Sequence, residues 1–195
     1  MNAGEVPPEI QLDLIQASQA RGTPELTKRL ERFEASRARD DHLGNFRECL
    51  AGGDPQRGRQ IFFGRAEASC RRCHQVNGQG AAIGPDLSKI GAEKTRDYLL
   101  EALVAPDKQI AKGFETAVLV TDAGKVYSGI VKEEKGNQLQ LMTAKGEVIV
   151  LDLVEIDERA TGKSAMPQDL VKQLSKSDLR DLVEYMASLK GLAGD

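Results

Sequence analysis

The sequence predicts an α+β protein that is mainly helical, with a small antiparallel β-sheet or barrel-like subdomain inserted between helices. Three observations lead to this prediction. Apolar residues recur at helical spacing in several segments before Pro106. From Glu115 to about Glu158 they recur at every second position, and after Pro167 the helical spacing returns. Turn-forming glycines divide the middle segment, so we expect four or five strands there.

The composition limits the classes of protein to be considered. The chain has 195 residues, 40% of them apolar, and a formal net charge of −3. This length suits one or two domains with a buried core. No run of eighteen apolar residues occurs, so we predict no transmembrane segment. The mildly acidic total argues against a general nucleic-acid binder.

Residues 1–51 are predicted to form a helical hairpin followed by a linker. Pro7-Pro8 precedes the first helix, and Gly22 ends it. Thr23-Pro24 then supplies an N-cap and a first helical residue for the second helix. Residues 36–45 are charged and poor in apolar side chains, which is typical of a linker. Because two helices bury little by themselves, we interpret 1–51 as the end of a helical-repeat region.

Residues 52–195 are predicted to form the second unit. Asp54 can cap a helix that starts at Pro55 and runs to about Phe63. A loop-rich stretch follows, and another helix is expected over roughly residues 93–104. The strands of the insertion are expected at about residues 114–158. The chain then closes with a helix whose start carries the capping-box pattern Ser175-Lys176-Ser177-Asp178.

The run Cys70-Arg71-Arg72-Cys73-His74 is the most informative motif. A C-x-x-C-H spacing is typical of covalent haem attachment, in which two thiols add to the porphyrin vinyl groups and the histidine binds the iron. The alternatives are half of a zinc site or a dithiol redox pair. A zinc site needs four ligands, and only Cys49 and His42 remain to supply them. A thioredoxin-like pair would need a βαβ context, which the sequence lacks.

Four further motifs accompany this run, and together the five resemble class I c-type cytochromes in the order of that family. Along the chain the five are Gly58-x-x-x-Phe62, Cys70-x-x-Cys73-His74, Ile83-Gly84-Pro85-Asp86-Leu87, Ser164-Ala165-Met166-Pro167 and Asp181-Leu182-Val183-Glu184-Tyr185-Met186. The resemblance implies a class I cytochrome c fold over residues 52–195, with one covalently attached haem c.

The resemblance also implies a role for each site residue. Cys70 and Cys73 would hold the porphyrin, and His74 would be the proximal iron ligand. Met166 would be the distal iron ligand, and a His/Met pair raises the reduction potential and favours electron transfer. The carbonyl of Pro85 would accept a hydrogen bond from the other ring nitrogen of His74 and so orient it. Gly58 and Tyr185 would mark the crossing of the first and last helices.

Met166 competes with other residues for the distal position. Met142 falls in a predicted strand and Met186 on the apolar face of the last helix, where methionine usually packs in the core. Met166 is in a loop before a proline. The alternatives are an open distal site, Met142 turned in from the β segment, or His42, which we otherwise expect to be a solvated surface histidine.

Cys49 is left over from the haem motif. Outside the cytoplasm an unpaired cysteine can form an intermolecular disulfide, so one hypothesis is a Cys49-linked homodimer. The other is a plain buried thiol.

The chain departs from compact class I cytochromes by the insertion between His74 and Met166, which are 92 residues apart. With this insertion it resembles the haem-binding domains of planctomycetes and verrucomicrobia, found at the C-terminus of large dehydrogenase-like proteins. The resemblance implies a redox partner protein or an upstream dehydrogenase domain. Residues 1–8 lack the features of a signal peptide. Because covalent haem attachment implies export, we expect a periplasmic protein whose signal peptide is not in this chain.

The charge distribution bears on partners. Residues 115–158 carry nine acidic side chains against four lysines, a net of −5, with one aromatic residue. Such a surface repels phosphate and offers no stacking platform, so we predict no nucleic-acid binding. Residues 54–74 carry five arginines against two acids. This basic rim either steers an acidic redox partner or is simply solvated.

The sequence therefore predicts a monohaem electron-transfer domain that is not itself an enzyme. The competing class is a haem enzyme or a gas or redox sensor with an open distal site. A non-haem structural module would require the C-x-x-C-H run to be coincidental.

Overall fold

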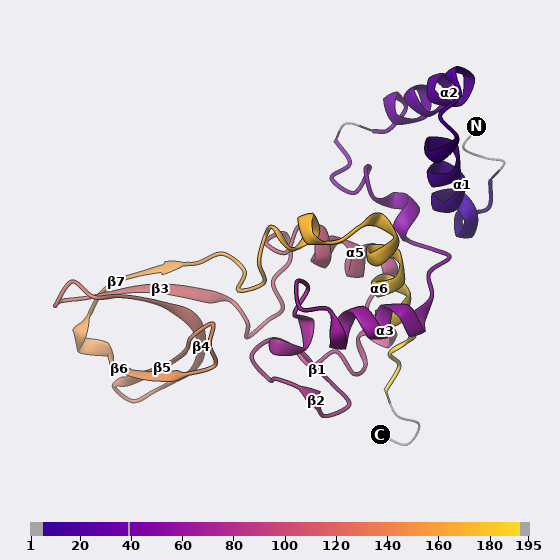
Figure 1. Ribbon diagram of the computed structural model, residues 1–195. Coiled ribbons are helices and arrows are strands. Elements are labelled where there is room, and N and C mark those ends of the chain that lie inside the picture. The colour runs from indigo at the N-terminus through magenta and orange to yellow at the C-terminus, as the bar shows by residue number, and fades with distance from the viewer. Residues whose placement is uncertain (1–5, 39, 192–195) are drawn as a thin grey trace.

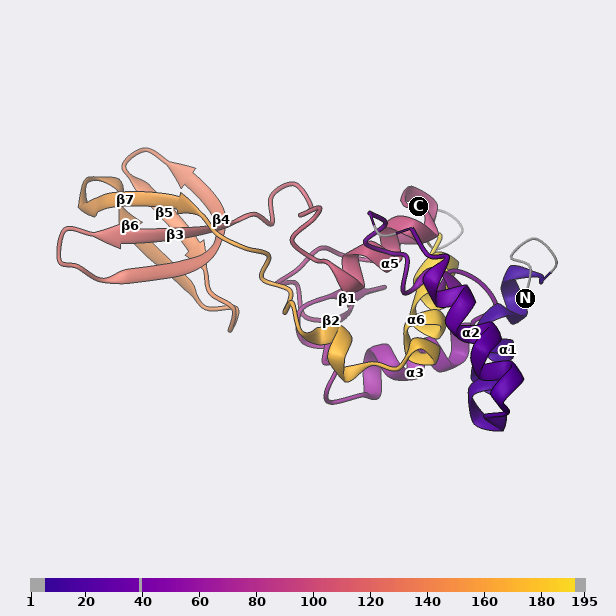
Figure 2. The same ribbon diagram turned by 90° about the horizontal axis from the view of Figure 1, so that it is seen from above.

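The computed structural model describes residues 6–38 and 40–191, which form a helical hairpin, a helical core and a β-sheet (Figure 1). The sheet projects from the helical core and is joined to it by two chain segments, as both views show (Figures 1 and 2). The hairpin lies on the opposite side of the core from the sheet. This arrangement agrees with the predicted α+β class.

The hairpin consists of α1 (Pro8–Arg21) and α2 (Pro24–Ala35). Gly22 ends α1 with a φ of 59°, and the Thr23 hydroxyl accepts a hydrogen bond from the Leu26 N–H at 3.4 Å. Both signals are those predicted from the sequence. Leu12 and Ile15 of α1 are buried, whereas α2 has no buried residue.

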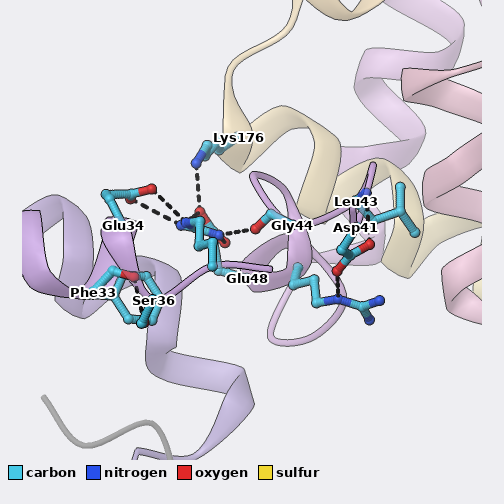
Figure 3. Close-up of polar contacts among 10 residues, drawn as sticks. Phe33, Glu34, Ser36, Asp41, Leu43, Gly44, Glu48 and Lys176 are labelled. Atoms are coloured by element: carbon cyan, nitrogen blue, oxygen red, sulfur yellow. Dashed lines mark hydrogen bonds and ion pairs between the residues drawn. The ribbon is translucent and has the colours of Figure 1, made fainter. Parts of the chain in front are cut away.

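An ion-pair network ties the end of the hairpin to the core (Figure 3). Glu48, in the short 3₁₀ helix η1 (Arg47–Cys49), accepts hydrogen bonds from both Nη atoms of Arg37, each at 2.9 Å. Its carboxylate also accepts one from Nζ of Lys176 at 2.6 Å. Leu43 and Cys49 belong to the same buried cluster as the helices that follow. The predicted domain boundary between residues 1–51 and 52–195 stays a prediction. The ion pairs of Glu48 and the shared buried cluster join the segments on either side of it.

The helical core surrounds one apolar cluster. It is built from α3 (Pro55–Gly64), η2 (Cys70–Arg72), α4 (Ile90–Glu93), α5 (Arg96–Val104), η4 (Leu170–Gln173) and α6 (Lys176–Ser188). The predicted caps are present. Asp54 accepts from the Gln56 N–H at 2.8 Å, and Ser175 and Asp178 form a complete capping box. The helix expected at 93–104 instead begins at Arg96, because Thr95 caps it and the chain is extended at Lys94.

Helices α3 and α6 cross at Gly58. A Cβ atom there would lie 2.0 Å from the Asp181 carbonyl oxygen and 2.6 Å from Cβ of Tyr185. Only a glycine permits this approach, so the predicted crossing of Gly58 and Tyr185 is confirmed. The rings of Phe62 and Tyr185 pack beside it with centroids 5.7 Å apart.

The inserted sheet has five antiparallel strands in the order β6-β5-β4-β3-β7. They are β3 (Thr116–Thr121), β4 (Val126–Lys135), β5 (Gln138–Met142), β6 (Val148–Asp152) and β7 (Ile156–Thr161). Gly124, Gly136 and Gly146 have positive φ in the three predicted turns. Its core contains Ala117, Leu119, Leu139, Leu141 and Leu151. The strands span residues 116–161, where the sequence predicts an insertion at about residues 114–158. The edge strand β7 is polar and gives little alternating signal.

No helix in the described part of the chain is long and apolar enough to cross a membrane.

Candidate functional site

The C-x-x-C-H run forms one tight turn after α3. Ser69, directly before the turn, has a φ of 50°, and the backbone then continues as the 3₁₀ helix η2. The His74 N–H donates to the Cys70 carbonyl at 2.9 Å. Cys70 and Cys73 are half-buried free thiols, and Cys70 packs against the core cluster. Burial raises the pKa of Cys70 to about 11.

The chain after His74 folds back over this turn. A two-stranded hairpin, β1 (Gln75–Val76) and β2 (Gln79–Gly80), reverses direction at Asn77-Gly78, where both residues have positive φ. The Gly84 N–H then donates to the Cys73 carbonyl at 2.7 Å. These backbone contacts place residues 80–85 against the C-x-x-C-H turn.

The His74 ring is held in one orientation. Its Nδ1 lies 2.9 Å from the Pro85 carbonyl oxygen, and a carbonyl can only accept, so Nδ1 carries the proton. Nε2 therefore keeps its lone pair. Burial lowers the pKa of His74 below 6.5, although the Pro85 hydrogen bond opposes this, so the imidazole is neutral at pH 7. The hydrogen bond implied by the family resemblance is present in the structure.

Gly84 supports the same ring from one side. A Cβ atom at Gly84 would lie 2.9 Å from Cε1 and 3.1 Å from Nδ1 of His74. The glycine backbone thus packs directly against the imidazole. In the sequence Gly84 stands out only as part of a loop motif, and no local pattern indicates its contact with the ring.

Met166 lies in the loop between β7 and η4. It is half-buried against the core cluster that Cys70 also contacts. Its N–H donates to the Ser164 hydroxyl at 3.2 Å.

The structure also places the residues that competed with Met166 for the distal position. Met142 is buried in β5, a strand that lies away from β1 in both views, and Met186 is buried in α6 (Figures 1 and 2). Both behave as core residues. His42 is exposed, as expected, and its Nε2 contacts the Glu101 carboxylate.

The donor set fits a covalently attached haem better than a metal bound by the protein alone. Two thiols three residues apart and a neutral imidazole with a free Nε2 match that chemistry. Among residues 6–38 and 40–191, no three His, Cys, Asp or Glu side chains are grouped so as to hold a metal ion. The zinc alternative therefore gains no support, because it needs four ligands.

The positively charged surface around the C-x-x-C-H turn is smaller than the five arginines of residues 54–74 indicate, because three of these arginines contact neighbouring side chains. Arg57 pairs with Asp181 at 3.3 Å, and Arg65 with Asp178 at 2.6 Å. The Arg59 guanidinium lies 5.0 Å from the Phe63 ring centroid. The other two arginines, 71 and 72, are exposed and make no ion pair with any residue that the structure describes. They lie between the two cysteines.

Cys49 is completely buried, with 0% of its surface exposed. Burial raises the pKa of its thiol to about 12. A disulfide to a second copy would require this sulfur to leave the core, so the structure does not support the predicted Cys49-linked homodimer. The plain buried thiol is the alternative that the structure shows.

A comparison with protein families agrees with this reading of the site. Residues 55–134 match the family model of cytochrome c. The matched region begins with α3, includes the C-x-x-C-H turn and Pro85, and extends into the sheet as far as Glu134. It supports a c-type cytochrome with covalently bound haem, iron and a role in electron transfer. The matched region does not include Met166. No curated protein matches the chain.

Proposed function

We propose that this chain is a monohaem c-type cytochrome domain that transfers single electrons. Cys70 and Cys73 attach the porphyrin, His74 is the proximal iron ligand and Met166 is the distal ligand. When bound, the haem supplies an iron that cycles between the ferric and ferrous states. The protein supplies the attachment and the ligands.

One observation carries this proposal, namely the fixed His74 imidazole. The Pro85 carbonyl holds the proton on Nδ1 at 2.9 Å, and the Gly84 backbone packs against the ring. A metal-binding histidine gains both orientation and basicity from such a partner. The same hydrogen bond leaves Nε2, the atom that would bind the iron, unprotonated on a half-buried ring.

The second ligand follows from the environment of Met166. Its loop lies against the core cluster that Cys70 also contacts. A thioether is a soft ligand that favours ferrous iron and raises the reduction potential, which suits electron transfer more than oxygen chemistry. We therefore favour an electron carrier over an enzyme.

The partner and the compartment follow from the same chemistry. Covalent attachment of haem takes place after export, so the domain works in the periplasm. Electrons come from a dehydrogenase, either a separate protein or an upstream domain of the same parent chain as in the planctomycete and verrucomicrobial proteins, and pass to a downstream acceptor. The exposed Arg71 and Arg72 give the attachment turn a positive surface for an acidic partner.

The attachment is tested by expressing the chain with haem-attachment machinery and measuring haem that survives denaturation. Cys70→Ser and Cys73→Ser should each lose a thioether bond, and the double variant should lose all covalent haem. Cys49→Ser is the matched control and should keep it. Covalent haem in the double variant, or none in the parent chain, would contradict the proposal.

The ligands are tested by the near-infrared absorption band that thioether ligation gives to ferric haem. Met166→Leu should abolish this band, whereas the matched variants Met142→Leu and Met186→Leu should keep it. If the parent chain lacks the band and its reduced form is high-spin, the distal site is open, and a haem enzyme or gas sensor becomes the better reading.

A further inference from the structure

The Met166 loop is anchored where the sheet joins the helical core. Two segments make this junction, residues 105–115 leading into β3 and residues 162–169 leading out of β7 (Figures 1 and 2). The Gly162 N–H donates to the Thr116 carbonyl at 2.8 Å, and the Thr116 hydroxyl donates to the Lys163 carbonyl. The two segments therefore cannot separate at this point without breaking hydrogen bonds.

Asp107 extends this anchorage to Met166. Its Oδ1 accepts a hydrogen bond from the Ser164 N–H at 2.7 Å. The hydroxyl of Ser164 in turn accepts one from the Met166 N–H at 3.2 Å. Two successive hydrogen bonds thus connect the carboxylate of Asp107 with the backbone of the proposed distal ligand.

Asp107 is itself attached to a rigid element. It lies in the turn directly after α5, closed by a hydrogen bond from the Lys108 N–H to the Ala105 carbonyl at 2.9 Å. Helix α5 buries Leu99, Leu100 and Leu103 in the core cluster. At the far end of the loop, η4, in which Leu170 is buried, packs against the same helix. Both ends of the Met166 loop are therefore fixed to α5.

An open hollow of about 300 Å³ lies beside this turn, lined by Ala105, Asp107, Lys108 and Gln168. The hydrogen bond from the Ser164 N–H to Asp107 joins the loop to the turn at this place.

We infer that Asp107 is a positioning residue that holds Met166 in place as the distal ligand. The inference rests on the proposed function, because it presupposes that Met166 binds the iron. It gives the inserted sheet a role, since the junction that carries the sheet also fixes the distal loop. Asp107 does not touch the haem itself and acts through Ser164.

The test measures how readily an external ligand displaces Met166 from the iron. Imidazole is titrated into the ferric holoprotein, and loss of the near-infrared thioether band gives its apparent affinity. Asp107→Ala removes the acceptor for the Ser164 N–H, so imidazole should bind about tenfold more tightly. Asp107→Asn keeps an oxygen acceptor and should behave like the parent chain. Ser164→Ala should act in the same direction as Asp107→Ala.

The matched control is Asp122→Ala, in the turn between β3 and β4, whose carboxylate makes no contact with the loop that carries Met166. It should leave the imidazole affinity unchanged. Equal affinities for Asp107→Ala and the parent chain would overturn the inference, as would equal effects of Asp107→Ala and Asp122→Ala. If the parent chain itself lacks the thioether band, the assignment of Met166 has failed first, and that result is seen before any variant is compared.

Discussion

The backbone of Gly84 packs against the imidazole of His74 so closely that a Cβ atom would lie 2.9 Å from Cε1. Contacts of this length between a Cβ and a ring carbon require one of the two to move. The ring is also held by Pro85 through Nδ1 at 2.9 Å. The two contacts together hold the imidazole in one orientation.

Gly84→Ala should therefore displace the His74 ring. We expect a loss of about 1–3 kcal/mol in the free energy of unfolding, as for other overpacked sites. The holoprotein should also show a changed Soret spectrum, because the orientation of the proximal ligand is disturbed. Denaturant unfolding and absorption spectra check both outcomes. An unchanged spectrum would mean that the ring is free to move without consequence for the iron.

Gly58 makes the closest backbone approach between α3 and α6, since a Cβ atom at this position would lie 2.0 Å from the Asp181 carbonyl oxygen. Gly58→Ala should separate the two helices and lower the free energy of unfolding by about 3 kcal/mol. Gly64→Ala is the matched control in the same helix, because a Cβ there meets no atom within 4 Å. It should be neutral or slightly stabilising. Similar losses in the two variants would show that helix propensity, not the crossing, determines the effect.

Cys49 should resist alkylation in the folded protein. Its pKa of about 12, against an ordinary value of 9.0, lowers the thiolate population at pH 8 by about a thousandfold, and the sulfur is buried as well. The folded holoprotein should show no iodoacetamide adduct by mass spectrometry until urea is added, and only monomer on a non-reducing gel. The variant Cys49→Ser shows how much iodoacetamide adduct forms at residues other than Cys49. A rapid adduct at neutral pH in the folded protein would contradict the burial of this residue.

Local signals in the sequence predicted much of the fold. The caps at Thr23, Asp54 and Ser175 each act within three residues, and all three are present. The turns of the sheet were predictable in the same way, since glycines with positive φ lie between alternating apolar runs. The C-x-x-C-H run and Pro85 were identified through fixed spacing, and the structure brings them together.

Contacts between distant segments were not predictable. Glu48 lies shortly after residues 36–45, which were interpreted as a linker, and charged residues are usually exposed. Nothing near it in the sequence indicates that Lys176, which is 128 residues away, completes its ion pair. The sequence left open whether a fifth strand exists, and the polar strand β7 carries no clear pattern for a related reason. It is defined by pairing with β3 rather than by its own pattern. Asp107 shows no local sign of its hydrogen bond to Ser164, 57 residues later.

The ion pairs of Glu48 make a prediction about acid stability. Burial raises the pKa of Glu48, but hydrogen bonds from Arg37 and Lys176 outweigh this and bring the pKa below its ordinary value of 4.5. A carboxyl whose pKa is lower in the folded state stabilises the fold above its ordinary value. That stabilisation is lost as the pH falls through the lower, folded value. Docking of the hairpin to the core should therefore weaken below about pH 4.5.

Glu48→Gln removes the charge at constant shape, and so isolates this contribution. The side chain of Glu48 is only 1% exposed, so the variant places a neutral amide beside Arg37 in a buried site, although Arg37 keeps its ion pair with Glu34. We expect the free energy of unfolding at pH 7 to fall by about 1.5–3 kcal/mol. The difference from the parent chain should shrink as the pH is lowered, because the parent carboxylate is then protonated too. Glu25→Gln, on the exposed side of α2, should change stability by less than about 0.5 kcal/mol at either pH. A difference for Glu48→Gln that stayed constant with pH would show that shape and hydrogen bonding, not charge, join the hairpin to the core.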